Sequence, residues 1–184
     1  MLTLARLAAA TVLLLTLESC SYAYNIRAVV IGGRLAFVVA PWSGRHPDCI
    51  RGVTVSVDKG GPTATPAGGD DTALVRNGGA YWWKQFEGPD CLNSFPIFYG
   101  QALKGTPFDY GGGSKSSVEA KPLVIGHVYE VAMESSGSGY GTGWFRITPD
   151  RRLENWRSDP TPSVVNAQGY DVTVGEQVPA PPDG

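Results

Sequence analysis

The sequence has little of what metal and nucleophilic chemistry require. Among 184 residues there are two histidines, His46 and His127, and three cysteines. A zinc site needs more ligands than these at metal-binding spacing. The sequence also has no Gly-x-Ser-x-Gly segment, the pattern that positions the nucleophile of α/β-hydrolases. We therefore expect no metal, no cofactor and no enzymatic activity.

Charge is also scarce. Asp, Glu, Lys and Arg make up 17% of the chain, the formal net charge is −2 and the sequence pI is about 5.6. No overall positive field is available to hold nucleic acid or an anionic membrane surface, so we expect no nucleic-acid partner. Hydrophobic residues make up 42%, enough for a packed core, and the length fits one ordinary domain.

The longest apolar run is too short to span a membrane. It extends from Leu7 to Leu17, 11 residues, and follows a single positive charge at Arg6. A spanning helix needs about 20 apolar residues, whereas the apolar region of a signal peptide needs about 7 to 15. We therefore interpret residues 1–19 as an export signal and exclude them from the fold.

Two cleavage sites fit this signal. Residues 17–20, Leu-Glu-Ser-Cys, resemble the bacterial lipobox, in which the cysteine is lipidated and becomes the new N-terminus; Glu18 departs from the usual small or uncharged residue. Residues 21–23, Ser-Tyr-Ala, instead supply the small residues that an ordinary signal peptidase needs. The first site makes Cys20 a lipid attachment point, and the second discards it.

The cysteine count fits export in either case. With Cys20 removed or lipidated, Cys49 and Cys91 remain as an even pair, which in an oxidising compartment predicts a disulfide. That bond closes a loop of about 43 residues, worth about 4 kcal/mol by loop entropy. Two free buried thiols are the alternative.

Helix breakers and strand patterns together indicate an all-β fold. The chain has 24 Gly and 14 Pro and no apolar stripe of helical period. Short apolar or alternating segments recur between turn signals, and two glycines at 32–33 predict a tight hairpin. The expected strands are 25–31, 34–40, 50–57, 80–87, 95–103, 127–134, 143–148 and 153–156, with a further short one at 72–76.

This strand count predicts an antiparallel β-sandwich over residues 20–157, for which an immunoglobulin-like form is the most frequent solution. The expected long Gly-rich loops are 58–79, 105–117 and 137–143; the last continues into a strand and so lacks the helix that a phosphate-binding loop must open. Residues 158–184 are rich in proline, and we expect them to form a largely disordered tail.

Aromatic residues are the best candidates for binding. Neighbours in a strand face opposite ways, so one of Trp82 and Trp83 should fill the core and the other should face outward. Tyr81, Trp82, Trp83 and Tyr99 form the candidate ligand-binding set, with core packing as the alternative role for each.

The polar residues are weaker candidates for a functional site than the aromatic residues. His46, with Asp48 nearby and Asp90 brought close by the disulfide, would offer a base and an orienting carboxylate, but no companion nucleophile is evident. Asp70 and Asp71 are expected to be solvated on a flexible loop.

The chain as a whole resembles the lipoproteins of unknown function that are common in Gram-negative bacteria: a short signal, a lipobox-like cysteine, a small β-rich body and a proline-rich tail. The resemblance implies attachment to a membrane through the N-terminal lipid, in the periplasm or at the outer membrane, and no particular activity. We expect a non-enzymatic structural or interaction module of the cell envelope with a protein or glycan partner. The alternatives are a secreted, soluble carbohydrate- or peptide-binding domain and a hydrolase built on His46.

Overall fold

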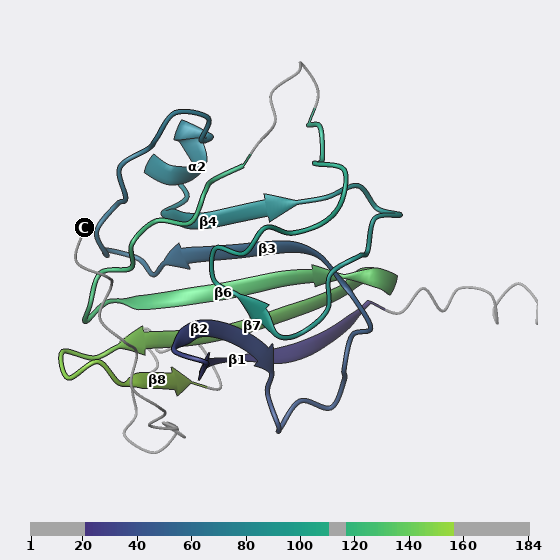
Figure 1. Ribbon diagram of the computed structural model, residues 1–184, viewed down its shortest axis with the longest axis horizontal. Helices are drawn as coiled ribbons and strands as arrows, with labels where there is room; N and C mark the ends of the chain where they lie inside the picture. Colours follow the sequence, from purple (N-terminus) through teal and green to yellow (C-terminus); the bar gives the residue numbers. More distant parts are fainter. Residues whose placement is uncertain (1–20, 111–116, 157–184) are drawn as a thin grey trace, which may run out of the picture.

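The computed structural model describes residues 21–110 and 117–156. These residues form eight strands, a short α-helix and a 3₁₀ turn, and the prediction of an all-β chain is confirmed (Figure 1). In chain order the elements are β1 (Tyr22–Ile31), β2 (Arg34–Val39), β3 (Ile50–Val57), α2 (Thr72–Arg76), β4 (Ala80–Gln85), β5 (Ile97–Phe98), β6 (Val128–Ser135), η1 (Ser136–Ser138), β7 (Gly139–Ile147) and β8 (Leu153–Trp156). The expected signal, Cys20 and the proline-rich tail lie outside the described residues.

The strands form one curled, mixed sheet rather than the two stacked antiparallel sheets of a sandwich. Their order is β4-β3-β6-β7-β1-β2-β5, and β8 pairs with β7 as a branch. The pairing of β1 with β7 is parallel, and the other strand pairs are antiparallel. Within the described residues, no helix has the length and apolar character needed to cross a bilayer.

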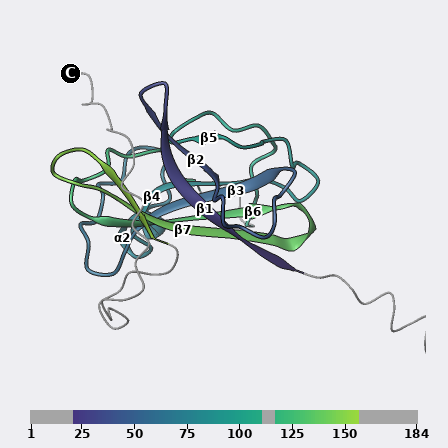
Figure 2. The same ribbon diagram turned by 90° about the horizontal axis from the view of Figure 1, so that it is seen from below.

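The curl comes from β1, which belongs to both parts of the sheet. Its first four residues, 22–25, pair with β7, and its last six, 26–31, pair with β2. Because one continuous strand serves both neighbours, β2 and β5 turn back over the inner face of β3, β6 and β7 (Figure 2).

Aromatic rings fill the space that the curl encloses. The ring of Phe37 on β2 lies 5.5 Å from that of Phe145 on β7, and Tyr129 stacks on Phe145 at 5.6 Å between ring centroids. Tyr81 meets Tyr129 edge-on at 5.1 Å. All four side chains are buried, so burial of these large apolar surfaces holds the two parts of the sheet together.

The hairpin of β1 and β2 is the one that the sequence predicts. Ile31 pairs with Arg34 across the turn, and Gly32 and Gly33 have φ of 56° and 75°. Positive φ at both central positions is the requirement of a type I′ turn, which only glycine and a few polar residues meet without strain.

The prediction that residues 137–143 form a long Gly-rich loop is wrong, because the turn ends at Ser138 and β7 begins at Gly139. Gly139, Gly141 and Gly143 alternate along the inner face of β7. A Cβ atom at Gly141 would lie less than 3.0 Å from the ring of Tyr24, and one at Gly143 would be as close to the Ile26 carbonyl oxygen. The three glycines therefore let β1 lie directly against β7.

Where β1 leaves β7, a side chain takes over the hydrogen bonding. Asn155 on β8 is 3% exposed and accepts a hydrogen bond from the Ala28 amide at 2.7 Å. Its Nδ2 donates to the Ala28 carbonyl oxygen at 3.0 Å. This amide satisfies both backbone groups of Ala28, which would otherwise be buried without a partner.

Two of the expected strands are corrected. Residues 72–76 form α2, because the Asp71 side chain caps the helix by accepting from the Ala73 and Leu74 amides at 2.9 and 3.1 Å. Val75 is then buried against Ala80 and Val118. Of the strand expected over 95–103, only Ile97–Phe98 pairs with β2, and Gly100 turns the chain away with φ of 74°.

Candidate functional site

The outer face of the sheet carries a shallow groove above β3 and β6, which we call the outer groove. Its volume is about 140 Å³. Thr54 on β3, Ala132 on β6 and Thr142 on β7 pair in succession across the sheet, and Gly52 lies two residues from Thr54 on the same face. Because these side chains are small or absent, the sheet surface is hollow along this row.

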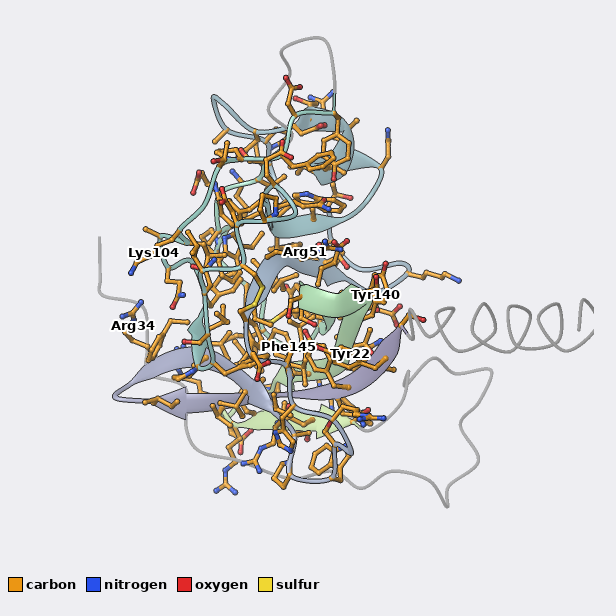
Figure 3. All side chains as sticks on the ribbon, turned by 90° about the vertical axis from the view of Figure 1, so that its right-hand side faces the viewer. Tyr22, Arg34, Arg51, Lys104, Tyr140 and Phe145 are labelled. Carbon is orange, nitrogen blue, oxygen red and sulfur yellow. A yellow bond between two sulfur atoms is a disulfide. The ribbon has the colours of Figure 1, made fainter. Side chains whose placement is uncertain are left out.

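Two aromatic residues stand at opposite sides of the outer groove. Trp83 on β4 pairs with Thr54 and is half-buried, since it packs against the small cluster of Val75, Ala80 and Val118. Tyr140, labelled in Figure 3, is 51% exposed and lines the outer groove from β7, two strands beyond β3. The outer groove thus presents aromatic surface on both flanks of a floor of small residues.

A chain of polar side chains borders one end of the outer groove. The Tyr110 hydroxyl donates to Gln85 Oε1, and Gln85 Nε2 donates to Glu134 Oε2 at 3.3 Å. Arg51 lies 3.5 Å from the same Glu134 oxygen, measured from its terminal nitrogen. Partial burial, and then the negative charge of Glu134, raise the pKa of the Tyr110 hydroxyl above the ordinary value of a tyrosine.

Of the aromatic residues singled out in the sequence, Trp83 alone lines the outer groove. Trp82 faces the core at 1% exposure and Tyr81 is buried at 2%. Trp82 and Trp83 do face opposite ways, as their positions in one strand require. Tyr99 is also structural: its hydroxyl donates to the Lys121 carbonyl oxygen at 2.7 Å, and burial of the ring raises its pKa.

The predicted disulfide is confirmed. Cys49 and Cys91 are bonded, with their Cα atoms 5.4 Å apart. Cys49 precedes β3 and Cys91 follows β4, so the bond ties together the ends of two neighbouring strands. The proposed lipidation site, Cys20, lies outside the described residues.

The polar residues considered for catalysis do not converge. His46 and Asp48 are both exposed in the turn before Cys49. Asp90 instead accepts a hydrogen bond from the Thr106 amide at 2.6 Å. Hydrogen bonding to the Thr106 side chain, and then to this amide, lowers the pKa of the Asp90 carboxyl group. Across residues 21–110 and 117–156, no group of three His, Cys, Asp or Glu side chains could hold a metal ion.

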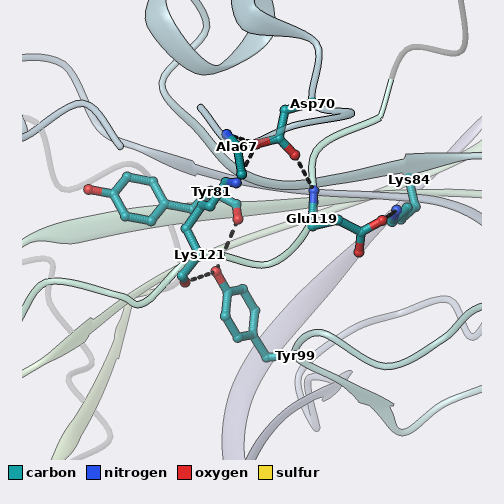
Figure 4. A network of polar contacts seen from close by, with 7 residues as sticks. All are labelled: Ala67, Asp70, Tyr81, Lys84, Tyr99, Glu119 and Lys121. Atoms are coloured by element: carbon teal, nitrogen blue, oxygen red, sulfur yellow. Dashed lines mark hydrogen bonds and ion pairs between the residues drawn. The ribbon is translucent and has the colours of Figure 1, made fainter. Parts of the chain in front are cut away.

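Asp70 is a fixed structural group, whereas the sequence suggested a solvated one. Its side chain is fully covered and pairs with Lys121. Its two carboxylate oxygens also accept from the amides of Ala67 at 2.6 Å and Glu119 at 3.0 Å (Figure 4). Burial alone would raise the pKa of Asp70, but the ion pair and the two amides together hold it below its usual range.

Asp70→Asn is expected to lower the free energy of unfolding at pH 7 by about 1.5 kcal/mol, because charge-assisted hydrogen bonds are lost. The folded-state pKa is depressed, so the carboxylate stabilises the fold above the unfolded-state pKa of about 3.9 and loses this effect as the pH falls through the folded-state value. Urea unfolding of both proteins between pH 7 and pH 3 should show the difference shrinking below about pH 4. The control is Asp48→Asn at an exposed turn. A difference that stays constant down to pH 3 would contradict this role.

Sequence reasoning missed most of the residues around the outer groove. Glu134 ends a strand whose alternation was evident in the sequence, so its outward position was predictable. Tyr140 was hidden because its glycine neighbours suggested a loop. Gln85 and Tyr110 gave no signal, because their contact joins residues 25 positions apart.

Comparison with protein-family models, with curated proteins and with solved structures finds no match for this chain.

Proposed function

We propose that this chain is an exported, non-enzymatic interaction module of the cell envelope, tethered through a lipid on Cys20, that binds a glycan in the outer groove. The observation that carries the binding proposal is the groove itself, with Trp83 and Tyr140 flanking a floor of small residues.

Export is supported by the disulfide. Bonds of this kind form and persist in oxidising compartments and are rare in the cytosol. The short apolar segment at 7–17 supplies the export signal, and the lipobox-like residues 17–20 supply the lipid attachment site. The proposed location is the periplasm or the outer membrane, and a secreted soluble form is the alternative if Cys20 is not retained.

The position of the outer groove favours a glycan over a peptide. Extended peptides commonly bind by adding a strand to a free sheet edge, where backbone groups are unpaired. The outer groove instead lies over β3, β6 and β7, whose backbones pair with a strand on either side. At its margin is the edge strand β4, where Val118 already takes the outward backbone groups of Trp83. A ligand here must be recognised by side chains.

The side chains around the outer groove suit a saccharide. Aromatic rings offer apolar faces on which the C–H face of a sugar ring can pack, and they lose little conformational entropy when they do so. Glu134, Gln85, Thr54 and Thr142 supply hydrogen-bonding groups for hydroxyls around that face.

Binding rather than hydrolysis is proposed because of the carboxylate count. Glycoside hydrolysis generally uses two carboxyl groups that flank the scissile bond at about 5 to 9.5 Å. Among the described residues that line the outer groove, Glu134 is the single carboxylate, and it is already paired with Arg51.

The test is titration of the protein with tetrasaccharides of β-1,4-linked N-acetylglucosamine, α-1,4-linked glucose and mannose. Tryptophan fluorescence should respond to at least one of them, because Trp83 lines the outer groove. Tyr140→Ala is expected to weaken that binding about tenfold, since an exposed aromatic contact is worth about 1.4 kcal/mol at such a site.

Ala132→Arg should abolish binding by filling the floor. Leu92→Ala, at a side chain that is 59% exposed and does not line the outer groove, is the matched control and should bind as the wild type does. An unresponsive panel, or a Tyr140→Ala protein with unchanged affinity, would refute glycan binding at this site.

A further inference from the structure

Two aromatic side chains among residues 21–110 and 117–156 are more than half exposed, Tyr140 at 51% and Tyr110 at 52%. Tyr140 lines the outer groove from β7. Tyr110 does not line it, but its hydroxyl donates to Gln85 Oε1, and Gln85 lines the outer groove from β4. Both exposed rings are thus connected to one groove.

A row of paired residues joins the two ends of the outer groove across the sheet. Beyond β4 the chain returns and pairs with the end of that strand, where the Phe108 amide donates to the Gln85 carbonyl oxygen at 3.0 Å. The row therefore runs through Tyr140, Glu134, Gly52, Gln85 and Phe108. Directly paired residues share a face of a sheet, so all five lie on the outer face. Four strand spacings separate the ends of the row, about 19 Å at the usual spacing of about 4.8 Å.

Phe108 and Tyr110 form a second aromatic surface at the β4 end of this row. Their rings meet edge-on at 4.7 Å between centroids, and Phe108 is half-buried. Gln85, which accepts from the Tyr110 hydroxyl, donates in turn to Glu134 at 3.3 Å. The exposed ring of Tyr110 is thus held by Phe108 and, through its hydroxyl, by Gln85. A ring held in place before binding loses little conformational entropy when a ligand packs on it.

The outer groove by itself is small for a ligand site. Its volume is about 140 Å³, whereas sites for small ligands commonly measure about 300 to 1,000 Å³. A ligand that fills it must therefore extend along the surface to gain further contacts. The row offers such a path, because Gly52 at its centre carries no side chain and the aromatic surfaces lie at its two ends.

We propose that Phe108 and Tyr110 form a second sugar subsite, and that the ligand of the outer groove is a linear oligosaccharide of about four units lying across the strands. The inference rests on the proposed glycan binding and adds the length and direction of the ligand. A sugar unit in an extended chain is about as long as one strand spacing, so about four units reach from Tyr140 to Phe108. One end packs on Tyr140 and Trp83, and the other packs on Tyr110.

The test compares chain lengths by calorimetric titration of the purified protein. The probes are the di- and tetrasaccharides of β-1,4-linked N-acetylglucosamine, α-1,4-linked glucose and mannose. The wild type should bind the tetrasaccharide of at least one series about tenfold more tightly than its disaccharide, because a second aromatic surface is engaged. Equal affinities for the two lengths would overturn the second subsite.

Tyr110→Ala is expected to remove this gain, weakening the tetrasaccharide about tenfold and leaving the disaccharide within about twofold of the wild type. Tyr110→Phe keeps the ring and loses the hydroxyl, so its tetrasaccharide affinity should exceed that of Tyr110→Ala. A Tyr110→Ala protein that binds the tetrasaccharide as the wild type does, or that loses both lengths equally, would contradict a separate subsite.

These results are separable from those for the proposed function. Tyr140→Ala should weaken both lengths, because it alters the outer groove itself. If Tyr140→Ala weakens binding and Tyr110→Ala does not, glycan binding in the outer groove stands and the second subsite is refuted. A wild type that responds to none of the six saccharides refutes both.

Discussion

Gly141→Ala is expected to lower the free energy of unfolding by at least about 3 kcal/mol, although it adds a single methyl group. The new Cβ would overlap the ring of Tyr24, which is 2% exposed and packs edge-on against Phe95 at 6.3 Å between centroids. Neither the ring of Tyr24 nor the backbone of β7 can move away without a large energetic cost. The ring is enclosed by the core, and the backbone of β7 is held by pairing with β6 on one side and β1 on the other.

Urea unfolding measures this effect, and two further variants test whether it comes from the contact with Tyr24. Gly44→Ala adds the same methyl group where no atom lies within 4 Å, so its stability should stay within about 0.5 kcal/mol of the wild type. Tyr24→Leu removes part of the ring, and the double variant should be less destabilised than the sum of the two single variants. A Gly141→Ala protein as stable as the Gly44→Ala protein would show that Tyr24 of β1 is not packed closely against Gly141 of β7 in solution.

Replacing Cys49 and Cys91 together by alanine is expected to cost about 4 kcal/mol of unfolding free energy. The bond closes a loop between residues 42 positions apart, and the entropy that it removes from the unfolded chain has this size in the chain-entropy model. The bond also holds the segment after β4 beside the start of β3, where Ile50 donates its amide proton to the Asn93 carbonyl oxygen at 2.6 Å. A loss of about 4 kcal/mol is a large share of the stability of a domain of this size.

The measurement is urea unfolding with and without a thiol reductant. The reductant should bring the wild type down to the stability of the double variant and leave the double variant unchanged. If the double variant matched the oxidised wild type, the bond would contribute nothing to the folded state.

The local features of the fold were predictable because they depend on neighbours in the sequence. Alternation revealed β3 and β6, and two adjacent glycines revealed the turn between β1 and β2. The disulfide was predictable because two cysteines remain once Cys20 is set aside and because the expected compartment is oxidising. Each of these signals lies within a short segment or follows from a count, so no long-range information was needed.

The features that escaped prediction depend on distant partners. The glycines of β7 look like a loop until Tyr22 and Tyr24 are placed over them, more than a hundred residues away in the chain. Asp70 looks solvated until Lys121 reaches it, 51 positions later. The mixed sheet likewise depends on β1 finding β7.

The candidate site was predictable only in part for the same reason. Strand alternation placed one of Trp82 and Trp83 outside, but it could not say which. The floor of the outer groove comes from the cross-strand row of Thr54, Ala132 and Thr142, which only the register of three strands brings together.

The partners of β1 also determine when the core can close. Ala28 exchanges hydrogen bonds with Asn155, 127 residues further along the chain, and the first residues of β1 pair with the start of β7. A polypeptide that is synthesised amino end first cannot make these contacts until β8 has been made. Contacts of such separation are slow to form, because a long loop must close before they are made. The order of strands in this chain thus delays closure of the core until β7 and β8 are available to β1, although the hairpin of β1 and β2 can form before them.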